Sequence, residues 1–459
     1  MKYYLIGISG IGMSALAFML KDLGYEVLGS TKEKNYICSL LENNGIKVIY
    51  GHKEDNITKD IDFVVYSSAI KKDHIELKRA RKLSLALLHR SDLLNDLINL
   101  HKKNILVTGT HGKTTTTSLI SYIFYKAKRK FSSYIGGLVD FFNGKNAVLD
   151  KSFETIICEA DESDKSFLKY NPYYAVITNI DEDHLDTYFS KENIKKTFLR
   201  FINSTNTFGK VFLSLENSFL NEKFLKNIKR KFVYISEEFS KKLLSNKYLD
   251  YILSYRRNGR EIYLYKNNKL LFSYNLHLPG KHNILNSILA AAVALENNIP
   301  LSTIKEAFLS FKNAKRRLEI IFKEENMDIT LIDDYAHHPK ELQATFDALL
   351  ELFKNKKIFV IFQPHRYSRF YKLKNDFLEV LKKYRKDINI FITDVYSAGE
   401  SFNNFDINIK DIAEKLNIKY ISHPNQIPIE PNSVYVSIGA GDIYKWLLEL
   451  KRRILSRNL

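Results

Sequence analysis

Residues 104–117 constrain this chain more than any other part of its sequence. The apolar run at residues 105–107 predicts a short buried strand, and Gly109 and Gly112 predict a tight turn directly after it. Lys113 and a run of threonines then open a helical pattern. A strand, a glycine loop and the N-terminus of a helix, in this order, are typical of a loop that binds phosphate groups.

The residue types of this loop indicate what it can hold. Its glycines let backbone N–H groups approach an anion, Lys113 brings a positive charge, and Thr114 offers a hydroxyl group to Mg²⁺. The loop is shorter than the P-loop motif, because Val107 stands where the first glycine of that motif would be. A glycine turn with a solvated lysine stays as the alternative.

The composition indicates a globular chain of two or three domains. It has 459 residues, of which 45% are hydrophobic, enough to form buried cores. Its two cysteines, Cys38 and Cys158, lie far apart, which argues against a disulfide framework and indicates a reducing, cytoplasmic location. The first residues enter a strand pattern without a signal sequence, and no apolar run reaches the ~18 residues of a membrane-spanning helix.

The formal net charge of +18 bears on the class of partner. Basic chains often bind nucleic acids, but here the lysines are dispersed, and neither a zinc-finger spacing nor an RNA-binding aromatic signature is present. A positive field also suits an enzyme whose substrates are all anions. We therefore expect anionic small-molecule substrates and no nucleic acid, with a nucleic-acid-dependent NTPase as the alternative from another class.

Strand and helix patterns alternate along the chain in three blocks, so the expected fold class is α/β with three domains. Residues 1–102 predict a Rossmann-like domain with a parallel sheet, and residues 314–459 predict a C-terminal doubly wound domain. Residues 103–313 form the expected P-loop-type ATPase domain. Within it, residues 251–278 contain short β-rich runs broken by turn sequences, which predict a small antiparallel sheet.

The same patterns give expected bounds for individual elements. The expected strands cover residues 3–8, 25–29, 48–50, 63–66, 105–107, 155–158, 175–178, 211–214, 329–332, 358–362, 388–392 and 434–438. The expected helices include residues 13–23 and 284–295.

A second glycine loop lies near the N-terminus. Gly7, Gly10 and Gly12 follow the first expected strand, much as in a dinucleotide fingerprint, although their spacing differs. Residues 29–31, Gly-Ser-Thr, stand where an acidic residue would bind a ribose, so a nicotinamide-dependent oxidoreductase is disfavoured. A nucleotide diphosphate at the helix N-terminus is favoured, and a tight turn without a ligand is the alternative.

Acidic residues follow two strands of the central block. Glu159, Asp161, Glu162 and Asp164 come after the strand at residues 155–158, and His184 comes after the next strand. Carboxyl ends of parallel strands meet at one edge of a sheet, beside the phosphate loop, where Mg²⁺ would find the oxygen ligands that it prefers. Acidic, solvated turns are the alternative.

Further polar residues mark the end of the central block and the C-terminal block. Asn283 and Asn286 are three residues apart on one helix face and could contact an adenine edge, or else cap the helix. Arg366 and Arg369, also three apart, can present a guanidinium fork to a carboxylate.

Together these segments resemble a known enzyme family. The sequences Gly-Thr-His-Gly-Lys-Thr-Thr, Glu-Ala-Asp-Glu-Ser-Asp, Asn-Ile-Asp-x-Asp-His, Leu-Pro-Gly-x-His-Asn-x-x-Asn and Asp-Asp-Tyr-Ala-His-His-Pro are similar, in order and spacing, to those of the ATP-dependent Mur ligases. The resemblance covers nearly the whole chain, and residues 363–369, Gln-Pro-His-Arg-Tyr-Ser-Arg, are its most discriminating part.

The resemblance implies ligation of L-alanine to the lactyl carboxylate of UDP-N-acetylmuramate, with ATP and Mg²⁺, in peptidoglycan precursor synthesis. ATP would phosphorylate the carboxylate, and the amine of alanine would attack the resulting acyl phosphate. Two alternatives stay open: a ligase that recycles a murein tripeptide onto the same UDP-sugar, and an NTPase that is not a ligase.

The resemblance also implies roles for residues at matching positions. The implied catalytic residues are Lys113, Glu159, His184, Arg317 and Asp334. The implied ATP-binding residues are Gly109, Thr110, His111, Gly112, Lys113, Thr114, Thr115, Asn283, Asn286 and Arg317. The implied ligands of Mg²⁺ are Thr114, Glu159 and His184. The implied substrate-binding residues are Gly10, Gly12, Ser67, Arg90, Tyr335, His337, Arg366 and Arg369.

The first block departs from the family pattern in two places. The family often has Asn-Pro-Glu after Ser-Ser-Ala-Ile, where this chain has Lys-Lys-Asp-His-Ile-Glu at residues 71–76. Two arginines are usual where His89 and Arg90 stand. Some relatives carry a carbamylated lysine at the position of His184, so that modification is not expected at this position.

Overall fold

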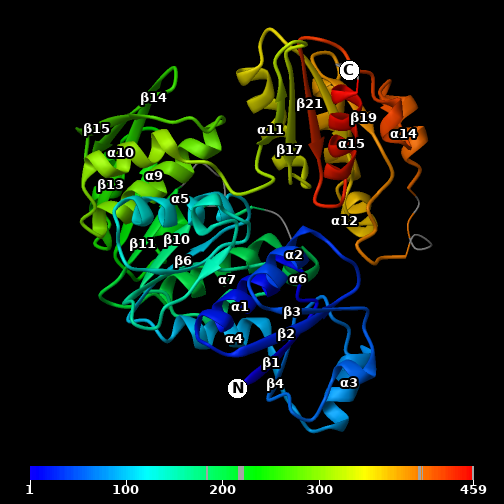
Figure 1. The fold of residues 1–459 in the computed structure, drawn as a ribbon. Helices are drawn as coiled ribbons and strands as arrows, with labels where there is room; N and C mark the ends of the chain where they lie inside the picture. The colour runs from blue at the N-terminus through cyan, green and yellow to red at the C-terminus, as the bar shows by residue number, and fades with distance from the viewer. Residues whose placement is uncertain (182–184, 215–221, 402–404, 406, 457–459) are drawn as a thin grey trace. The chain divides into compact units, whose positions relative to one another are not determined.

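The computed structural model describes residues 1–181, 185–214, 222–401, 405 and 407–456 (Figure 1). Two compact units make up the chain: residues 1–277 with 283–314, and residues 278–282 with 315–459. The first unit contains two sheets and the second contains one. None of the helices in the described part of the chain combines the length and the apolarity needed to cross a bilayer.

The N-terminal sheet has five parallel strands in the order β3-β2-β1-β4-β5. Its strands are β1 (Lys2–Ile6), β2 (Glu26–Thr31), β3 (Lys47–Tyr50), β4 (Phe63–Tyr66) and β5 (Ala86–His89), and its helices are α1 (Ile11–Asp22), α2 (Tyr36–Asn43), α3 (Ile75–Lys82) and α4 (Arg90–Ile98). Alternate residues of β1 face opposite sides: Tyr4 packs in a core with Leu77 of α3, and Leu5 packs in the core that holds α1 and α4. This is the expected Rossmann-like arrangement.

The central sheet has ten strands, in the order β15-β14-β13-β12-β11-β10-β6-β9-β7-β8. Its strands are β6 (Lys103–Thr108), β7 (Ser132–Tyr134), β8 (Ala147–Val148), β9 (Thr155–Glu159), β10 (Tyr174–Ile177), β11 (Lys210–Ser214), β12 (Phe232–Ser236), β13 (Leu249–Asn258), β14 (Glu261–Lys266) and β15 (Lys269–Asn275). The α-helices of this part are α5 (Lys113–Lys126), α6 (Leu185–Tyr188), α7 (Lys191–Asn203), α8 (Glu222–Leu225), α9 (Lys281–Glu296) and α10 (Leu301–Ser310).

The expected antiparallel strands are confirmed at β13, β14 and β15. Gly259, Asn267 and Asn268 make the turns between them with positive φ, as glycine and asparagine do most readily. These strands do not form a separate sheet, because β13 also pairs in parallel with β12 and so extends the central sheet.

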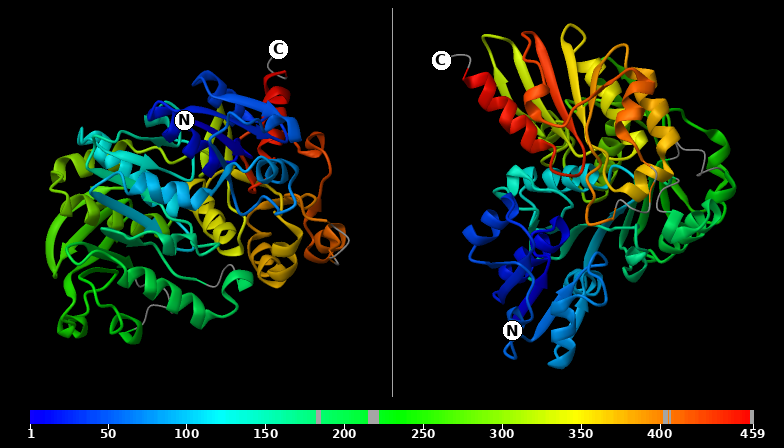
Figure 2. Two further views of the ribbon diagram at one scale, coloured as in Figure 1. Left: turned by 90° about the horizontal axis from the view of Figure 1, so that it is seen from below. Right: turned by 90° about the vertical axis from the view of Figure 1, so that its right-hand side faces the viewer.

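The sheet of the second unit has the order β16-β17-β21-β18-β19-β20, and only β16 is antiparallel to its neighbour among these strands. The strands are β16 (Glu319–Glu324), β17 (Ile329–Asp334), β18 (Lys357–Phe362), β19 (Asn389–Ile392), β20 (Lys419–Tyr420) and β21 (Ser433–Ile438), and the helices are α11 (Pro339–Leu352), α12 (Tyr367–Lys372), α13 (Lys374–Tyr384), α14 (Ile409–Leu416) and α15 (Tyr444–Leu455). One face packs against α15 and the other against α11, α13 and α14 (Figure 2). The doubly wound C-terminal fold is thus confirmed.

Several expected bounds were wrong at their ends. The first strand stops at Ile6 instead of continuing to residue 8, because Gly7 has a φ of +76° and turns the chain away from the sheet. The helix after it begins at Ile11, two residues early, since Gly10 already occupies its N-cap position. The helix expected at residues 284–295 begins at Lys281, so Asn283 lies inside it, and helix capping by this asparagine is excluded.

Candidate active site

The expected phosphate-binding loop connects β6 to α5. Hydrogen bonds join this loop to the segment that follows β10. The backbone N–H of His111 donates to Oδ1 of Asn179 at 2.9 Å, and the hydroxyl of Thr178 donates to the His111 carbonyl at 2.6 Å. Gly109 has a φ of +134°, and a Cβ there would lie 2.1 Å from Oγ1 of Thr178. The close approach of these two segments therefore requires glycine at this position, where the sequence predicted a tight turn.

Lys113 is the first residue of α5, and its ammonium group folds back over the loop. Nζ donates to the carbonyl oxygens of Gly109 at 2.7 Å and Thr110 at 3.1 Å. It also pairs with Glu162, with 2.9 Å between Nζ and Oε2. The alternative of a solvated lysine is wrong: the side chain of Lys113 is 16% exposed and that of Glu162 is 3% exposed.

Burial and neighbouring charges control the ionisation of this pair. Burial raises the pKa of Glu162 to about 7. The positive charge of Lys113 lowers this pKa, whereas the negative charge of Asp161 raises it further. Burial alone would lower the pKa of Lys113, but Glu162, Asp161 and Glu159 together raise it. Lys113 therefore keeps its charge, while Glu162 titrates close to neutral pH.

Thr114 and Glu159 lie side by side, as the positions of their strands predicted. The hydroxyl of Thr114 donates to Oε1 of Glu159 at 3.2 Å, and the backbone N–H of Gly136 donates to Oε2 at 2.9 Å. A Cβ on Gly136 would lie 2.5 Å from both carboxylate oxygens, so this glycine leaves room for the carboxylate. Hard oxygen donors at a phosphate loop fit Mg²⁺. The third expected ligand, His184, lies outside the described residues.

Arg90 joins the N-terminal domain to the acidic segment of the central domain. Its Nη2 atom lies 2.7 Å from Oδ2 of Asp161 and 3.3 Å from Oδ2 of Asp164. Burial would raise the pKa of Asp161, but the charges of Arg90 and Lys113 hold it below its usual value. Asp161 thus stands between the expected UDP-binding domain and the phosphate loop.

The other expected UDP-binding residues lie at the same edge of the N-terminal sheet. Gly10 is the N-cap residue of α1. A Cβ on Gly12 would lie 2.9 Å from the hydroxyl of Tyr134 and 3.8 Å from Nη1 of Arg90, so Gly12 lies close to the Arg90 side chain. Ser67 follows β4 directly, and its neighbour Ser68 donates to Asp164 at 2.6 Å.

Asn283 and Asn286 share one face of α9, and both are buried. Nδ2 of Asn286 donates to Oδ1 of Asn283 at 3.2 Å. The amide of Asn286 also lies against the phosphate loop, because a Cβ on Gly112 would be 2.8 Å from its Oδ1 atom. The amide pair expected at the adenine is therefore next to the loop expected at the phosphates.

In the second unit, Asp334 ends β17 and anchors the loop that follows it. Its carboxylate accepts hydrogen bonds from the backbone N–H groups of Leu318 at 2.8 Å and Ala336 at 2.9 Å. Burial raises the pKa of Asp334 to about 6, although Arg317 opposes this shift. The guanidinium of Arg317 lies 5.4 Å from the ring centroid of Tyr335, so the structure brings these three expected site residues together.

Two histidines occupy the same edge of this sheet. The rings of His337 and His365 are 6.0 Å apart, and His337 also packs edge-on against Tyr335. Burial lowers the pKa of His337 to about 4, and burial together with His337 lowers the pKa of His365 to about 3. Both imidazoles are therefore neutral at physiological pH.

Arg366 and Arg369 contact different partners. Nε of Arg366 pairs with Oε1 of Glu400 at 2.7 Å, and this arginine has a φ of +69°. Nη1 of Arg369 lies 3.4 Å from Nδ1 of His365. Arg369 thus lies with the histidines, whereas Nε of Arg366 is already paired with Glu400.

Several residues at these sites were not identified as functional from the sequence. Glu162 and Asp161 stood in a recognised acidic cluster, but their individual contacts depend on Lys113 and Arg90, far away along the chain. Glu400 directly follows no expected strand and belongs to no recognised motif, so the sequence did not identify it as functional. Asn179 belongs to the recognised motif Asn-Ile-Asp-x-Asp-His. Its position just after a strand end is the sequence feature that could have predicted its hydrogen bond to the loop.

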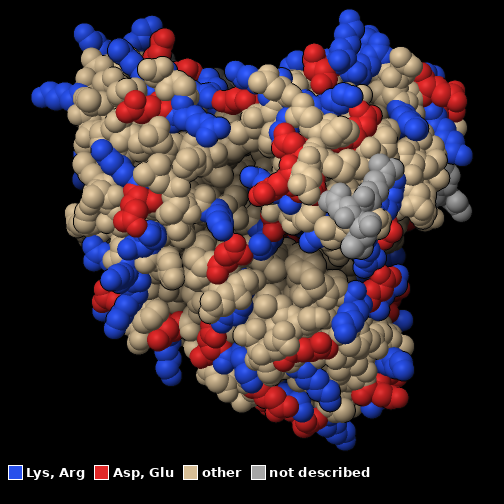
Figure 3. All heavy atoms as spheres, turned by 45° about the horizontal axis from the view of Figure 1, so that its top comes forward, with Lys and Arg blue, Asp and Glu red and all other residues tan. Residues whose placement is uncertain are grey.

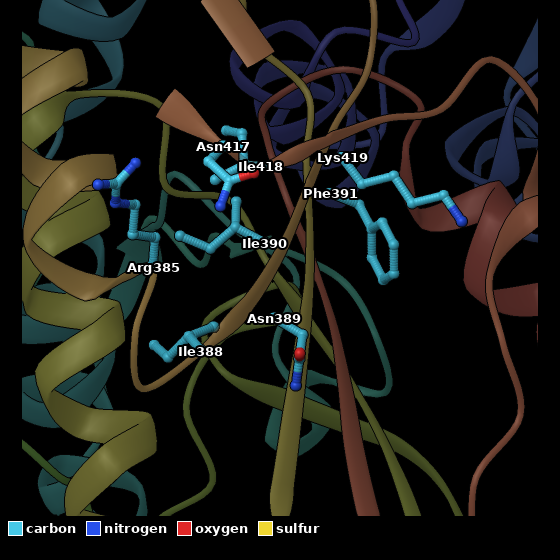
Figure 4. Close-up of a pocket in the computed structure, with 8 residues that line it drawn as sticks. All are labelled: Arg385, Ile388, Asn389, Ile390, Phe391, Asn417, Ile418 and Lys419. Atoms are coloured by element: carbon cyan, nitrogen blue, oxygen red, sulfur yellow. The ribbon is translucent and has the colours of Figure 1, made fainter. Parts of the chain in front are cut away.

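A separate pocket of about 450 Å³ lies at the amino ends of β19 and β20. Its lining residues, shown in Figure 4, are Arg385, Ile388, Asn389, Ile390, Phe391, Asn417, Ile418 and Lys419. The expected site residues of this sheet lie at the carboxyl ends of its parallel strands or, for Arg317, just before the antiparallel β16 at the same edge, so the pocket lies at the opposite edge.

The surface charge does not gather into one basic patch on the face shown in Figure 3. Lysine and arginine side chains are interspersed there with aspartate and glutamate. This distribution agrees with the dispersal of lysines along the sequence.

The sequence matches three family models along most of its length. The model described as Mur ligase family, catalytic domain, matches residues 2–102, Mur ligase middle domain matches residues 107–294, and Mur ligase, glutamate ligase domain, matches residues 316–430. A relative from Hydrogenobaculum sp., named UDP-N-acetylmuramate–L-alanine ligase, is 39% identical over 97% of this chain and 97% of its own. The chain belongs to the Mur ligase family.

Solved structures of Mur ligases share its fold. The crystal structure of UDP-N-acetylmuramate–alanine ligase from Thermotoga maritima is 28% identical, with a TM-score of 0.83 and full coverage of both chains. A murein peptide ligase from Psychrobacter arcticus has a TM-score of 0.73 at 20% identity, over 98% of both chains, and shows the fold alone. The three-domain α/β architecture expected from the sequence is therefore that of a Mur ligase.

Proposed function

We propose that this chain ligates L-alanine to the lactyl carboxylate of UDP-N-acetylmuramate, with conversion of ATP to ADP and phosphate. The observation that carries the proposal is the full-length similarity to relatives named for this reaction, at 39% identity in the Hydrogenobaculum protein. The phosphate loop with its buried Lys113 supports it, since the reaction begins with phosphoryl transfer. We further propose that the reaction supplies peptidoglycan precursors in the cytoplasm.

The reaction proceeds in two displacements. An oxygen of the lactyl carboxylate attacks the γ-phosphorus of ATP, ADP leaves, and an acyl phosphate forms. The neutral amine of alanine then attacks the acyl carbon, and the phosphate leaves with the former carboxylate oxygen. Phosphorylation is needed because an unactivated carboxylate has no suitable leaving group, and the task of the protein is mainly to position the groups and to neutralise charge.

Lys113 and the loop perform that task for the phosphates. The backbone N–H groups at the N-terminus of α5 favour an anion, and the ammonium of Lys113 can move from Glu162 to the transferring phosphoryl group. Glu162 takes up a proton more easily than an ordinary carboxyl group, which reduces the repulsion between it and the phosphates.

Thr114, Glu159 and His184 would hold Mg²⁺, although His184 lies outside the described residues. The ion would neutralise charge on the phosphate oxygens. Glu159 is already oriented for this role by the backbone N–H of Gly136, and Thr114 lies 3.2 Å from it.

The remaining expected roles belong to nucleotide and substrate binding. We assign Asn283 and Asn286 to adenine, and Arg317 and Asp334 to the nucleotide. The expected amino-acid-binding residues are Tyr335, His337, Arg366 and Arg369, and those for the UDP-sugar are Gly10, Gly12, Ser67 and Arg90. We also propose that the first domain ends at residue 102 and the second at residue 313.

An ADP-release assay across a panel of acceptors and amino acids tests the proposal. Release should require UDP-N-acetylmuramate and should be fastest with L-alanine. Faster release with L-alanyl-γ-D-glutamyl-meso-diaminopimelate would identify a recycling ligase instead. Release that needs neither the UDP-sugar nor an amino acid would identify an NTPase that is not a ligase.

A further inference from the structure

A cluster of two histidines and one glutamate lies in the N-terminal domain, on the α3 side of its sheet. His52 follows β3, His74 immediately precedes α3, and Glu76 lies in the first turn of α3, which Figure 1 labels. One ligand atom from each of the three side chains lies within 4.8 Å of the other two. The sequence gave no reason to group these residues, and neither the proposed reaction nor its expected site uses them.

Glu76 is the centre of the cluster and is completely buried. Its Oε1 atom accepts hydrogen bonds from the hydroxyl of Tyr4 at 2.8 Å and from Nδ2 of Asn56 at 2.7 Å. Its Oε2 atom accepts from the hydroxyl of Ser30 at 2.7 Å and lies 3.1 Å from Nδ1 of His52. Neutral donors therefore fix the orientation of the carboxylate, as outer-shell groups do at metal sites.

The charge of this carboxylate lacks a permanent counterion among the partners that the structure describes. Those partners are two hydroxyl groups, one amide and one imidazole, so only His52 can carry a positive charge. A buried carboxylate is costly unless a cation or several hydrogen bonds compensate it. The hydrogen bonds to Glu76 supply part of this compensation, and a bound cation would also neutralise its charge.

His74 provides an independent observation that points to a ligand. It is the N-cap residue of α3, yet its side chain makes no capping hydrogen bond. Three other N-cap histidines, His89, His338 and His423, do accept a backbone N–H with a ring nitrogen. Nδ1 of His74 is buried and has no hydrogen-bond partner among the residues that the structure describes. Its ring packs edge-on against that of His52, with 4.7 Å between centroids.

We propose that His52, His74 and Glu76 bind a divalent transition-metal ion of the Zn²⁺ class. Two imidazole nitrogens and one carboxylate oxygen form a known zinc ligand set, which leaves a fourth position for water, whereas Mg²⁺ and Ca²⁺ prefer oxygen ligands alone. The 3.1 Å between His52 and Glu76 is close to the ~3.3 Å that separates two ligands of a tetrahedral zinc ion. The ligand atoms lie within 4.8 Å of one another, so His74 needs to move closer to the other two to complete the site. The 22% exposed side chain of His52 gives access from solvent.

An ion at this site would be linked to the N-terminal glycine loop. The hydroxyl of Ser30 donates a hydrogen bond to Glu76. The carbonyl oxygen of Ser30 accepts hydrogen bonds from the backbone N–H groups of Gly7 and Ile8, both at 2.9 Å. The ion would therefore join β3, α3 and the end of β2 beneath that loop. Metal binding should stabilise the N-terminal domain whatever reaction the chain catalyses.

Co²⁺ titration of the full chain, freed of metals by a chelator, tests this inference. Excess Mg²⁺ is present to occupy oxygen-rich sites. The readout is the visible absorption of tetrahedral Co²⁺, which Zn²⁺ should abolish when it displaces Co²⁺. His74→Asn is the chosen variant, because asparagine is a preferred N-cap residue and should preserve α3. His277→Asn is the matched control, since it removes an exposed histidine outside the cluster.

The parent and His277→Asn should give the same Co²⁺ spectrum, and Zn²⁺ should raise the thermal unfolding temperature of both. His74→Asn should bind Co²⁺ at least about tenfold more weakly at this site and should lose the stabilisation by Zn²⁺. His52→Gln should behave in the same way. An absent tetrahedral spectrum in the parent would overturn the proposal, and so would an unchanged Co²⁺ affinity in His74→Asn.

Discussion

The ammonium group of Lys113 lies 2.9 Å from a carboxylate oxygen of Glu162, and both side chains are largely buried. The residue best suited to neutralise a transferring phosphoryl group is thus paired with a carboxylate from the segment after β9. Phosphate groups must compete with Glu162 for Lys113, so this pair links the protonation of the protein to nucleotide binding.

Replacing Lys113 by alanine should lower kcat by ~10²-fold or more, because the lost charge acts mainly on the transferring phosphoryl group. The matched control is Lys102→Ala, which removes a lysine that is 79% exposed and paired with Glu154 at the surface. Steady-state ADP release measures both variants, and circular dichroism checks their folding. Near-normal turnover in Lys113→Ala would mean that the loop does not act on the phosphates.

Nucleotide affinity should depend on pH through Glu162. Since the pKa of this carboxyl group is raised to about 7, it becomes neutral as the pH falls through that value and releases Lys113 for the phosphates. A non-hydrolysable ATP analogue should bind more tightly at pH 6 than at pH 8. Glu162→Gln should remove this part of the pH dependence and leave only the titration of the analogue itself. Parallel profiles for parent and variant would exclude Glu162 as the titrating group.

The requirement for Mg²⁺ should shift when Glu159 is changed. Glu159→Gln and His184→Ala should each raise the Mg²⁺ concentration for half-maximal activity, because each removes an expected ligand. Glu154→Gln, which changes an exposed glutamate just before the amino end of β9, should leave that concentration unchanged. Mg²⁺ titrations that coincide for all variants would assign Glu159 and His184 a structural role.

Arg90→Ala should destabilise the contact between the N-terminal and central domains of the first unit. It leaves Asp161 and Asp164 without their guanidinium partner, at a cost of about 1–3 kcal/mol in the free energy of unfolding. Urea unfolding measures this cost, with Arg81→Ala on the exposed face of α3 as the control. If the two variants unfold alike, the Arg90 ion pairs contribute little to the fold. A raised KM for UDP-N-acetylmuramate in Arg90→Ala would support its expected role at that substrate.

The amino-acid pocket should prefer a small side chain and depend on Arg369 more than on Arg366. L-serine and glycine should react more slowly than L-alanine, since one methyl or hydroxyl group contributes only ~1–3 kcal/mol to discrimination. Arg369 lies with the neutral histidines, whereas Arg366 is paired with Glu400, so Arg369→Lys should raise the KM for alanine more than Arg366→Lys does. The reverse order would show that Arg366, despite its pairing with Glu400, contributes more than Arg369 to binding of the substrate carboxylate.

Local patterns were enough to predict much of the fold and part of the site. Thr114 and Glu159 were expected together because β6 and β9 were recognised as buried strands, and adjacent parallel strands bring their carboxyl ends to one edge. Asn283 and Asn286 were expected on one face from helical spacing, and the hydrogen bond between them agrees.

The errors concern contacts between residues that are distant in sequence. The burial of Lys113 depends on Glu162, the partner of Arg366 is Glu400, and His74 meets His52 only through the pairing of β3 with the rest of its sheet. Residue type and spacing do not encode such pairs, because many acidic residues could serve each cation equally well. The end of β1 was misjudged for a local reason, since nothing in the apolar run before Gly7 reveals its positive φ.

Transfer of oxygen from substrate to phosphate tests the proposed ligation most directly. UDP-N-acetylmuramate labelled with ¹⁸O in its lactyl carboxylate is incubated with ATP, Mg²⁺ and L-alanine, and the released phosphate is examined by mass spectrometry. Formation of an acyl phosphate predicts that each phosphate carries one oxygen from the carboxylate, in step with formation of the UDP-N-acetylmuramoyl-L-alanine product. Phosphate that carries oxygen only from ATP and solvent water would contradict the account, because it would show that the chain hydrolyses ATP without activating the sugar carboxylate.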